Sequence, residues 1–269
     1  MTDQISGWLS NTLQAEGFAE YEIRRTGNTG KSDGYLGLIF FVTVNGVTKD
    51  KQPKRLDLVL KVSKDNAYLK ENTTVVSAFL QEMLIYEKVL PTFDAFQKEK
   101  GVVDIFKSYP KCYKCLHLHR KEVIVLQNLK SLGFELHDRK KTMNFRHARA
   151  VLREYGKLHA ISFALKDQRE EIFNALAGGC KDLFMQFLSE EKSRDAFNGE
   201  FKKVLDLLKE FGEHELYDKF KRYETCAVKT FMDVCEANEP QSSFAHGDCW
   251  NNNFMFKYKV VEETYCLVI

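Results

Sequence analysis

The pattern of apolar and polar positions marks the first quarter of the chain as rich in strands. An amphipathic helix is expected over residues 5–20. From Tyr21 to Ser63 the chain is rich in β-branched and aromatic residues and is interrupted by glycines, including the turn pair Asn45-Gly46. This pattern predicts a strand, a glycine-bearing loop, a second strand, a polar connection and a third strand that ends near Lys61.

Residues 70–90 change to the helical period, with apolar residues three or four positions apart. Pro91 follows directly, so the helix is expected to end there. The apolar stripe consists of Val75, Val76, Phe79, Leu80, Met83, Tyr86 and Leu90.

The rest of the chain contains one more strand pattern and then becomes mostly helical. Lys121 to Ser131 reads as a strand followed by a hinge, and helical periods continue to about residue 237. The closing segment from Ser243 reads as loop, strand, turn and strand. We therefore predict an α+β protein with a small β-sheet lobe over residues 1–128 and a mostly helical lobe over residues 129–269.

Composition narrows the class of protein. The 269 residues carry a net charge of +2, with Lys and Arg spread along the whole chain, so neither nucleic acid nor an acidic membrane is required as partner. The longest apolar run, Leu36 to Val44, is far shorter than the roughly 20 residues that span a bilayer. The N-terminus lacks the pattern of a secretory signal, and seven cysteines without a framework spacing favour reduced thiols. These features predict a soluble cytoplasmic protein.

One short segment has the spacing of a catalytic loop. His246-Gly247-Asp248 followed by Asn253 matches the H-x-D-x-x-x-x-N pattern of kinases, in which the Asp accepts the proton of the attacking hydroxyl and the Asn holds a metal ion. The alternative is an Asn-rich turn in which Asp248 only caps the local backbone.

Two upstream residues favour the kinase interpretation. Lys61 lies near the end of an apolar strand, and Glu82 lies on the same helical stripe as Phe79 and Tyr86. A carboxylate on an apolar stripe needs a partner. A strand Lys followed about twenty residues later by a helix Glu is the ion pair that positions nucleotide phosphates in kinases. The alternatives are a lysine at a strand edge and a surface glutamate.

Two further segments are ambiguous. Between Arg24 and Gly37 the letters "GKS" resemble part of a P-loop, but that motif needs glycine where Arg25 stands and a helix where a strand is expected. The loop could still cover phosphates through its backbone and Lys31 or Ser32, or be a simple hairpin loop. The segment "CYKCLHLH" from Cys112 offers two Cys and two His, but a strand would send alternate ligands to opposite faces, which disfavours metal binding.

Taken together, these motifs occur in the order seen in a known family. "FAHGDCWNNNFMFKY", the Gly-Lys-Ser-Asp-Gly-Tyr loop, "AFLQEMLIYEKVLP", "IVLQNLKSLGFELHDR" and "GKLHAISFAL" resemble the ecdysteroid kinase-like proteins of the choline/aminoglycoside kinase-like group. The resemblance extends from about residue 20 to the last residue. It implies a two-lobed, protein-kinase-like fold and phosphorylation of a small-molecule hydroxyl, such as that of an ecdysteroid, with ATP and Mg²⁺.

The resemblance also assigns roles to individual residues. It implies that Asp248 is the catalytic base, Asn253 a Mg²⁺ ligand, Lys61 the phosphate-binding lysine and Glu82 its partner. The hinge from Leu126 to Leu129 would hold adenine through backbone groups. The nucleotide-binding residues implied in the loop and hinge are Gly30, Lys31, Ser32, Asp33, Gly34, Gln127, Asn128 and Leu129.

Two departures from the family pattern bear on these expectations. The hinge carries Gln127-Asn128 where an acidic pair is usual, which backbone recognition of adenine would tolerate. The chain ends at Ile269, before the Asp-Phe motif whose Asp is the main Mg²⁺ ligand in kinases. The sequence therefore reads as a fragment or short form, and a nucleotide-binding pseudokinase is the alternative to an active kinase. A P-loop NTPase centred on Lys31 is disfavoured.

Overall fold

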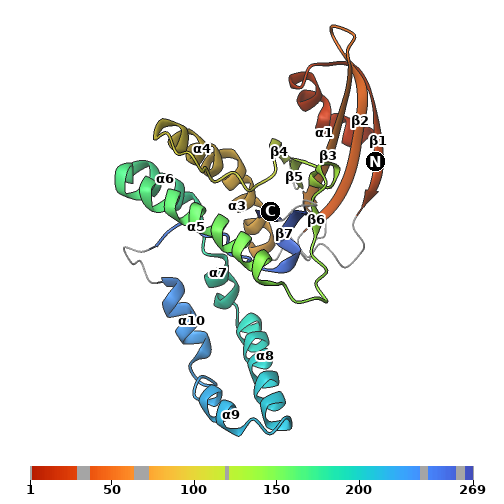
Figure 1. Cartoon of the computed structure of the whole chain (residues 1–269). Helices are drawn as coiled ribbons and strands as arrows, with labels where there is room; N and C mark the ends of the chain where they lie inside the picture. Colours follow the sequence, from red (N-terminus) through yellow and green to blue (C-terminus); the bar gives the residue numbers. More distant parts are fainter. Residues whose placement is uncertain are drawn as a thin grey trace. The chain divides into compact units, whose positions relative to one another are not determined.

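The computed structural model describes the chain at residues 2–28, 37–63, 73–118, 121–236, 242–258 and 264–268. Its N-terminal part is built around a five-stranded antiparallel sheet with the strand order β1-β2-β3-β5-β4 (Figure 1). The first three strands appear in the order that the sequence predicts. The strands are β1 (Phe18–Asn28), β2 (Gly37–Thr48), β3 (Pro53–Ser63), β4 (Cys112–Leu118) and β5 (Lys121–Gln127).

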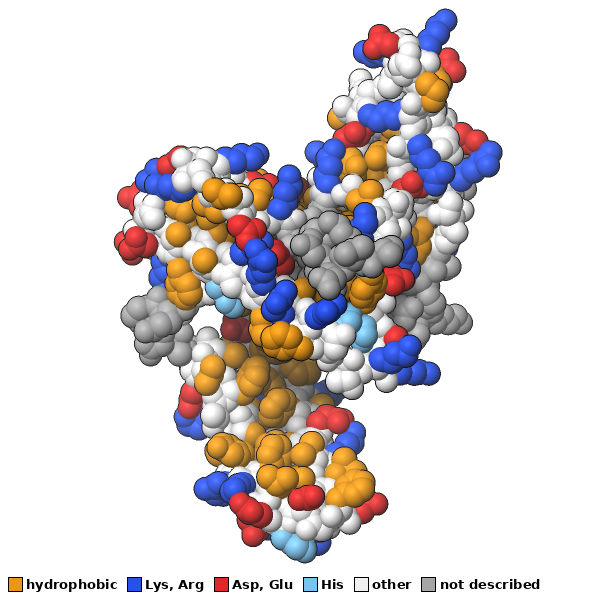
Figure 2. All heavy atoms as spheres, in the orientation of Figure 1, with side chains coloured by type: hydrophobic (Ala, Val, Ile, Leu, Met, Phe, Trp, Pro, Cys, Tyr) orange, Lys and Arg blue, Asp and Glu red, His pale blue; other side chains and the backbone are white. Residues whose placement is uncertain are grey.

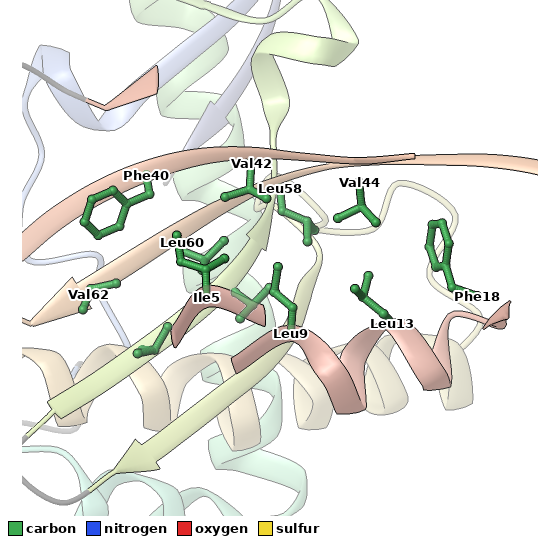
Figure 3. Packing of buried hydrophobic residues seen from close by; sticks show 12 residues of the cluster. Ile5, Leu9, Leu13, Phe18, Phe40, Val42, Val44, Leu58, Leu60 and Val62 are labelled. Carbon is green, nitrogen blue, oxygen red and sulfur yellow. The ribbon is translucent and has the colours of Figure 1, made fainter. Parts of the chain in front are cut away.

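Helix α1 (Thr2–Ala15) covers one face of this sheet. Its apolar residues pack against alternate residues of β2 and β3, as Figure 3 shows, because successive strand side chains point to opposite faces. The predicted helix over residues 5–20 ends too late, since Gly17 adopts a φ of 83° and the chain enters β1 at Phe18. The contacting residues are Ile5, Leu9, Leu13, Val42, Val44, Leu58, Leu60 and Val62.

Helix α3 (Thr73–Leu84) packs against a second cluster of sheet residues, formed by Cys115, Ile124 and Leu126. It supplies Phe79 and Met83, both fully buried. Leu80, assigned to the apolar stripe from the sequence, is 43% exposed, because it lies about 100° around the helix from Phe79.

The sequence predicts that the helix ends at Pro91, but the helical chain continues past this residue. A π-helical turn η1 (Ile85–Val89) leads directly into α4 (Leu90–Glu99), and Pro91 lies in the first turn of α4. The π-helical turn shifts the backbone hydrogen bonds, with the N–H of Leu90 donating to the carbonyl of Ile85, and the helix continues through the proline at this irregularity.

After β5 the chain forms the helical part and a second, small sheet. Helix α5 (Phe145–Gln168) is followed by α6 (Glu170–Gly179), and both contribute to a core with α4. The small antiparallel sheet has the order β6-β7-β8. Its strands are β6 (Glu135–Leu136), β7 (Phe254–Tyr258) and β8 (Thr264–Val268). A five-stranded antiparallel sheet followed by a mostly helical chain confirms the predicted α+β class.

The chain divides into two compact units, residues 1–179 with 243–269 and residues 180–242. The second unit is helical, and in it Phe231 contacts the rings of Phe184 and Phe197. Hydrophobic side chains gather on the face of these helices that Figure 2 shows. The helices are α7 (Leu183–Ser189), α8 (Glu191–Glu210), α9 (His214–Lys221) and α10 (Ala227–Glu236).

The predicted boundary between lobes at residues 128 and 129 is a different division of the chain and stays a prediction. Among the helices in the described ranges, none has both the length and the hydrophobicity that a membrane span requires.

Candidate active site

Lys61 and Glu82 form an ion pair between the sheet and helix α3. In β3, Leu60 and Val62 point toward α1, so Lys61 points to the opposite face of the sheet, where α3 lies. Its Nζ donates to Glu82 Oε2 at 2.5 Å. The contact that the sequence predicts between these two residues is therefore confirmed.

The surroundings of this pair leave it open to a ligand. The two side chains are 26% and 25% exposed, so the pair is neither dry nor fully solvated. Phe79 is fully buried beneath it, with Lys61 Nζ 5.5 Å from the ring centroid. An ammonium group has three N–H donors, and Glu82 uses one, so others remain for an anionic oxygen. The arrangement can hold a phosphate at a fixed position.

Gly37 is the first residue of β2, the strand that pairs with the Lys61 strand β3. A Cβ at this position would lie 2.8 Å from the carbonyl oxygen of Val62 and 3.0 Å from the ring of Phe79. Only glycine therefore allows β2 to pass this close to β3 and α3. The predicted phosphate-loop residues, Gly30 to Gly34 with Lys31, Ser32 and Asp33, lie outside the described residues.

The predicted hinge, Leu126 to Leu129, begins with the last two residues of β5. The N–H of Gln127 donates to the carbonyl of Lys111 at 2.9 Å, and the N–H of Asn128 donates to the carbonyl of Asp57 at 3.0 Å. The Asn128 side chain caps the short 3-10 helix η2 (Leu129–Leu132). Both N–H groups are thus engaged within the protein, so adenine binding at this segment would have to use its other backbone groups.

The loop with the kinase-like spacing folds on itself. Gly247 has a φ of 80°, a conformation that favours glycine, and this reversal lets the N–H of Asp248 donate to His246 Nδ1 at 3.2 Å. The amide nitrogen of Asn253 donates to the Asp248 carbonyl at 2.9 Å and to its carboxylate at 2.7 Å. Asp248 is exposed. The structure therefore brings the two predicted catalytic-loop residues into direct contact.

Buried groups anchor both ends of this loop. On the N-terminal side, the N–H of Phe244 donates to the Oγ of Ser162, a fully buried residue of α5, at 2.7 Å. The Phe244 ring meets those of Phe93 and Phe173 edge to face. On the C-terminal side, Phe254 is 3% exposed and begins β7. The exposed loop is thus held by its ends.

The small sheet connects the hinge to this loop. Met255, two residues after Asn253, packs against Leu129 of the hinge segment and against Phe134. Strand β6 pairs with β7 through Leu136 and Met255. The predicted hinge and the strand that follows the predicted catalytic loop, more than a hundred residues apart in the sequence, therefore share one packed cluster.

Asp248 and Asn253 present oxygen atoms of the type that binds Mg²⁺. The Asn253 amide nitrogen faces Asp248, which leaves its Oδ1 as the atom of that amide able to coordinate a cation. Carboxylate and amide oxygens are hard ligands that suit Mg²⁺. The donor set therefore fits this ion. In the described part of the chain, no three His, Cys, Asp or Glu side chains form a metal-binding group.

Sequence reasoning missed the residues that support the site. Ser162 gives no signal, because a buried serine in a helix looks like any other small residue until its partner Phe244 is known. Met255 and Leu129 read as ordinary apolar residues. Gly247 did carry a signal, since a glycine between the His and Asp of this motif indicates backbone that other residues rarely adopt.

The fold and the site together define the class. An antiparallel sheet whose third strand supplies Lys61, a following helix that supplies Glu82, and a helical part carrying the Asp248 loop are the features of a two-lobed, protein-kinase-like fold. The family model of the ecdysteroid kinase-like family matches residues 31–268, and the chain belongs to that family. Among proteins with curated descriptions, none matches it.

Proposed function

We propose that this protein transfers the γ-phosphoryl group of ATP to the hydroxyl group of a small-molecule alcohol. Membership of the ecdysteroid kinase-like family supports kinase-like phosphotransfer in general. The observation that carries the proposal is the contact of Lys61 with Glu82, which places a cation with spare N–H donors at a part-exposed position of the sheet. An ecdysteroid or a related alcohol is the proposed acceptor, and the cytoplasm the proposed compartment.

In the proposed mechanism each site residue has one task. Lys61 binds nucleotide phosphate oxygens, and Glu82 keeps its ammonium group in place. Asp248 orients the acceptor hydroxyl and accepts its proton as the new bond to phosphorus forms. Asn253 Oδ1 would hold Mg²⁺, which when bound supplies positive charge beside the phosphates. Catalysis then rests on positioning and electrostatics.

Phosphoryl transfer from γ-labelled ATP to a panel of ecdysteroids and simpler alcohols tests this proposal. We expect a labelled, alcohol-dependent product that requires Mg²⁺. ATP binding without any transfer, over the whole panel, would instead favour a nucleotide-binding pseudokinase.

Two lysine variants form a matched pair for the nucleotide site. We expect Lys61→Met to abolish transfer and to weaken ATP binding by roughly tenfold or more, because phosphate oxygens lose a charged donor. Lys31→Ala should have the smaller effect. The reverse ranking, measured by ATP titration calorimetry, would place the phosphates on a P-loop around Lys31 and contradict the proposal.

A further inference from the structure

Two cysteines of strand β4 lie on the same face of the sheet because of a β-bulge. Residues three apart in a regular strand point to opposite faces. In β4, however, Cys112 lies opposite Leu126 while Lys114 lies opposite Val125, so Tyr113 is an extra residue in the ladder. The bulge turns Cys112 and Cys115 to one side. The sequence-based expectation that the strand separates these ligands is wrong for this pair.

The two thiols are in contact beneath the candidate active site. Their sulfur atoms lie 3.8 Å apart. Cys115 is buried, whereas Cys112 is partly exposed. Both thiols belong to the cluster that contains Phe79 and Tyr86. Lys61 lies over the ring of Phe79, and Tyr86 follows Glu82 by one helical turn, so the cluster adjoins both members of the ion pair.

The two thiols differ in acidity. The hydrogen bond between the two thiols is the largest effect on Cys112 and holds its pKa below the ordinary value, although burial and the charges of Glu87 and Glu82 act in the opposite direction. The same hydrogen bond, together with burial and the neighbouring charges, raises the pKa of Cys115. Cys112 is therefore the thiol that ionises first, and it is also the one that solvent reaches.

We propose that Cys112 and Cys115 form a redox-active dithiol that closes to a disulfide on reaction with a hydroperoxide. The Cys112 thiolate attacks a peroxide oxygen, the O–O bond breaks, and Cys112 becomes a sulfenic acid as water or an alcohol leaves. The sulfur of Cys115 then attacks the sulfur of Cys112, the S–O bond breaks, and water leaves with the thiol proton. Two thiols are oxidised and one peroxide is reduced. Two equivalents of a small thiol would then reduce the disulfide back to the two cysteine thiols by thiol-disulfide exchange, and the small thiol leaves as its own disulfide.

Closing the bond would disturb the packing under α3. The sulfurs must approach from 3.8 Å to about 2 Å, so at least one side chain leaves its present position in the cluster. Tyr86 and Phe79 fill the adjoining space, and cores of this density transmit such shifts. The helix that holds Glu82 would move with them. This consequence rests on the proposed function, in which Lys61 binds the nucleotide phosphates: oxidation would then weaken nucleotide binding at Lys61.

A peptide map of the whole chain tests the disulfide. Trypsin cleaves after Lys111, Lys114 and Arg120, so the two cysteines fall in separate peptides, 112–114 and 115–120. After peroxide treatment and blocking of free thiols, we expect a linked pair of these peptides that reduction separates. Cys112→Ser should lose the link, as should Cys115→Ala, whereas Cys226→Ser, which removes a thiol of the other compact unit, should keep it.

Amide hydrogen exchange tests the coupling to α3. We expect residues of α3 to exchange on the order of threefold faster in the oxidised protein than in the reduced one, with no change in Cys112→Ser after the same treatment. Two results would overturn the inference: peptides in which Cys112 and Cys115 stay unlinked, or a link that leaves exchange in α3 unchanged.

A nucleotide titration of the reduced protein separates this inference from the proposed function. Failure of the reduced protein to bind ATP would count against the proposed function alone. The peptide map and the exchange rates would still decide whether the dithiol acts as inferred.

Discussion

The two halves of the candidate site are built in opposite ways. Lys61 and Glu82 come from a central strand and a packed helix, and each side chain is only about a quarter exposed. Asp248 and Asn253 lie on a loop, and Asp248 is exposed to solvent. The ion-pair half is built into the fold's core, whereas the loop half, which carries the predicted catalytic residues, is attached to the core through its flanking residues.

This difference indicates how the two halves respond to change. A substitution under the ion pair alters packing and thus stability, because Phe79 serves both the core and the site. A substitution in the loop leaves the anchors at Phe244 and Phe254 intact, so it can remove chemistry while the protein stays folded. Four predictions test this contrast.

The largest effect is expected for Asp248→Asn. The amide has nearly the same shape but cannot accept the hydroxyl proton, so kcat should fall roughly 10²–10⁴-fold while ATP affinity changes little. Steady-state kinetics with calorimetric ATP titration checks this. Asp50→Asn, an exposed change in the turn after β2, is the control and should leave both quantities unaltered. An unchanged kcat for Asp248→Asn would reduce Asp248 to a structural role.

Phe79→Ala should produce the largest loss of stability. Removing this fully buried ring is expected to lower the free energy of unfolding by about 3–5 kcal/mol. Leu80→Ala, at the neighbouring position that is 43% exposed, is the matched control and should cost less than about 1 kcal/mol. Urea unfolding of both variants measures the difference. Equal losses would mean that the site does not rest on the core as described.

The local elements were predictable where the residue pattern is strong. The third strand was predictable in detail, since Asp57 and Lys61 alternate with Leu56, Leu58, Leu60 and Val62, whereas the second strand lies in the apolar run from Leu36 to Val44, which marks a strand but does not separate its two faces. The Lys61–Glu82 contact was predictable for a further reason, since a carboxylate beside Phe79 needs a cation.

The errors arose where tertiary contacts override local preference. Pro91 reads as a helix end, but the π-helical turn before it lets a new helix start there. Cys112 and Cys115 read as opposed, because a one-residue bulge leaves no mark in the sequence. The anchors of the catalytic loop, Ser162 and Met255, depend on contacts with distant segments that one sequence does not reveal.

A double-mutant cycle on the ion pair should give an intermediate effect. Lys61→Met and Glu82→Gln should each weaken ATP binding. The loss of binding free energy in the double variant should be smaller than the sum of the two single losses, because Glu82 has no ammonium group left to position once Lys61 is replaced. We expect a coupling of about 1–2 kcal/mol in ATP affinity. Additive losses would show that Glu82 does not act through Lys61, in spite of the 2.5 Å contact.

The smallest effect is expected for Gly247→Ala, and it isolates backbone conformation from packing. A Cβ at Gly247 would have no neighbouring atom within 4 Å, so the only cost is the positive φ of 80°. That strain should amount to about 1 kcal/mol, and it would be relieved by movement of the adjacent Asp248.

The control is Gly156→Ala in α5. This position also has open space for a Cβ but has helical backbone, so the change should stabilise the protein by several tenths of a kcal/mol. In kinetics, Gly247→Ala should lower kcat by several-fold without changing ATP affinity. If ATP affinity fell as much as kcat, the loop and the ion pair would respond as one structural unit, and the contrast between the two halves would be wrong.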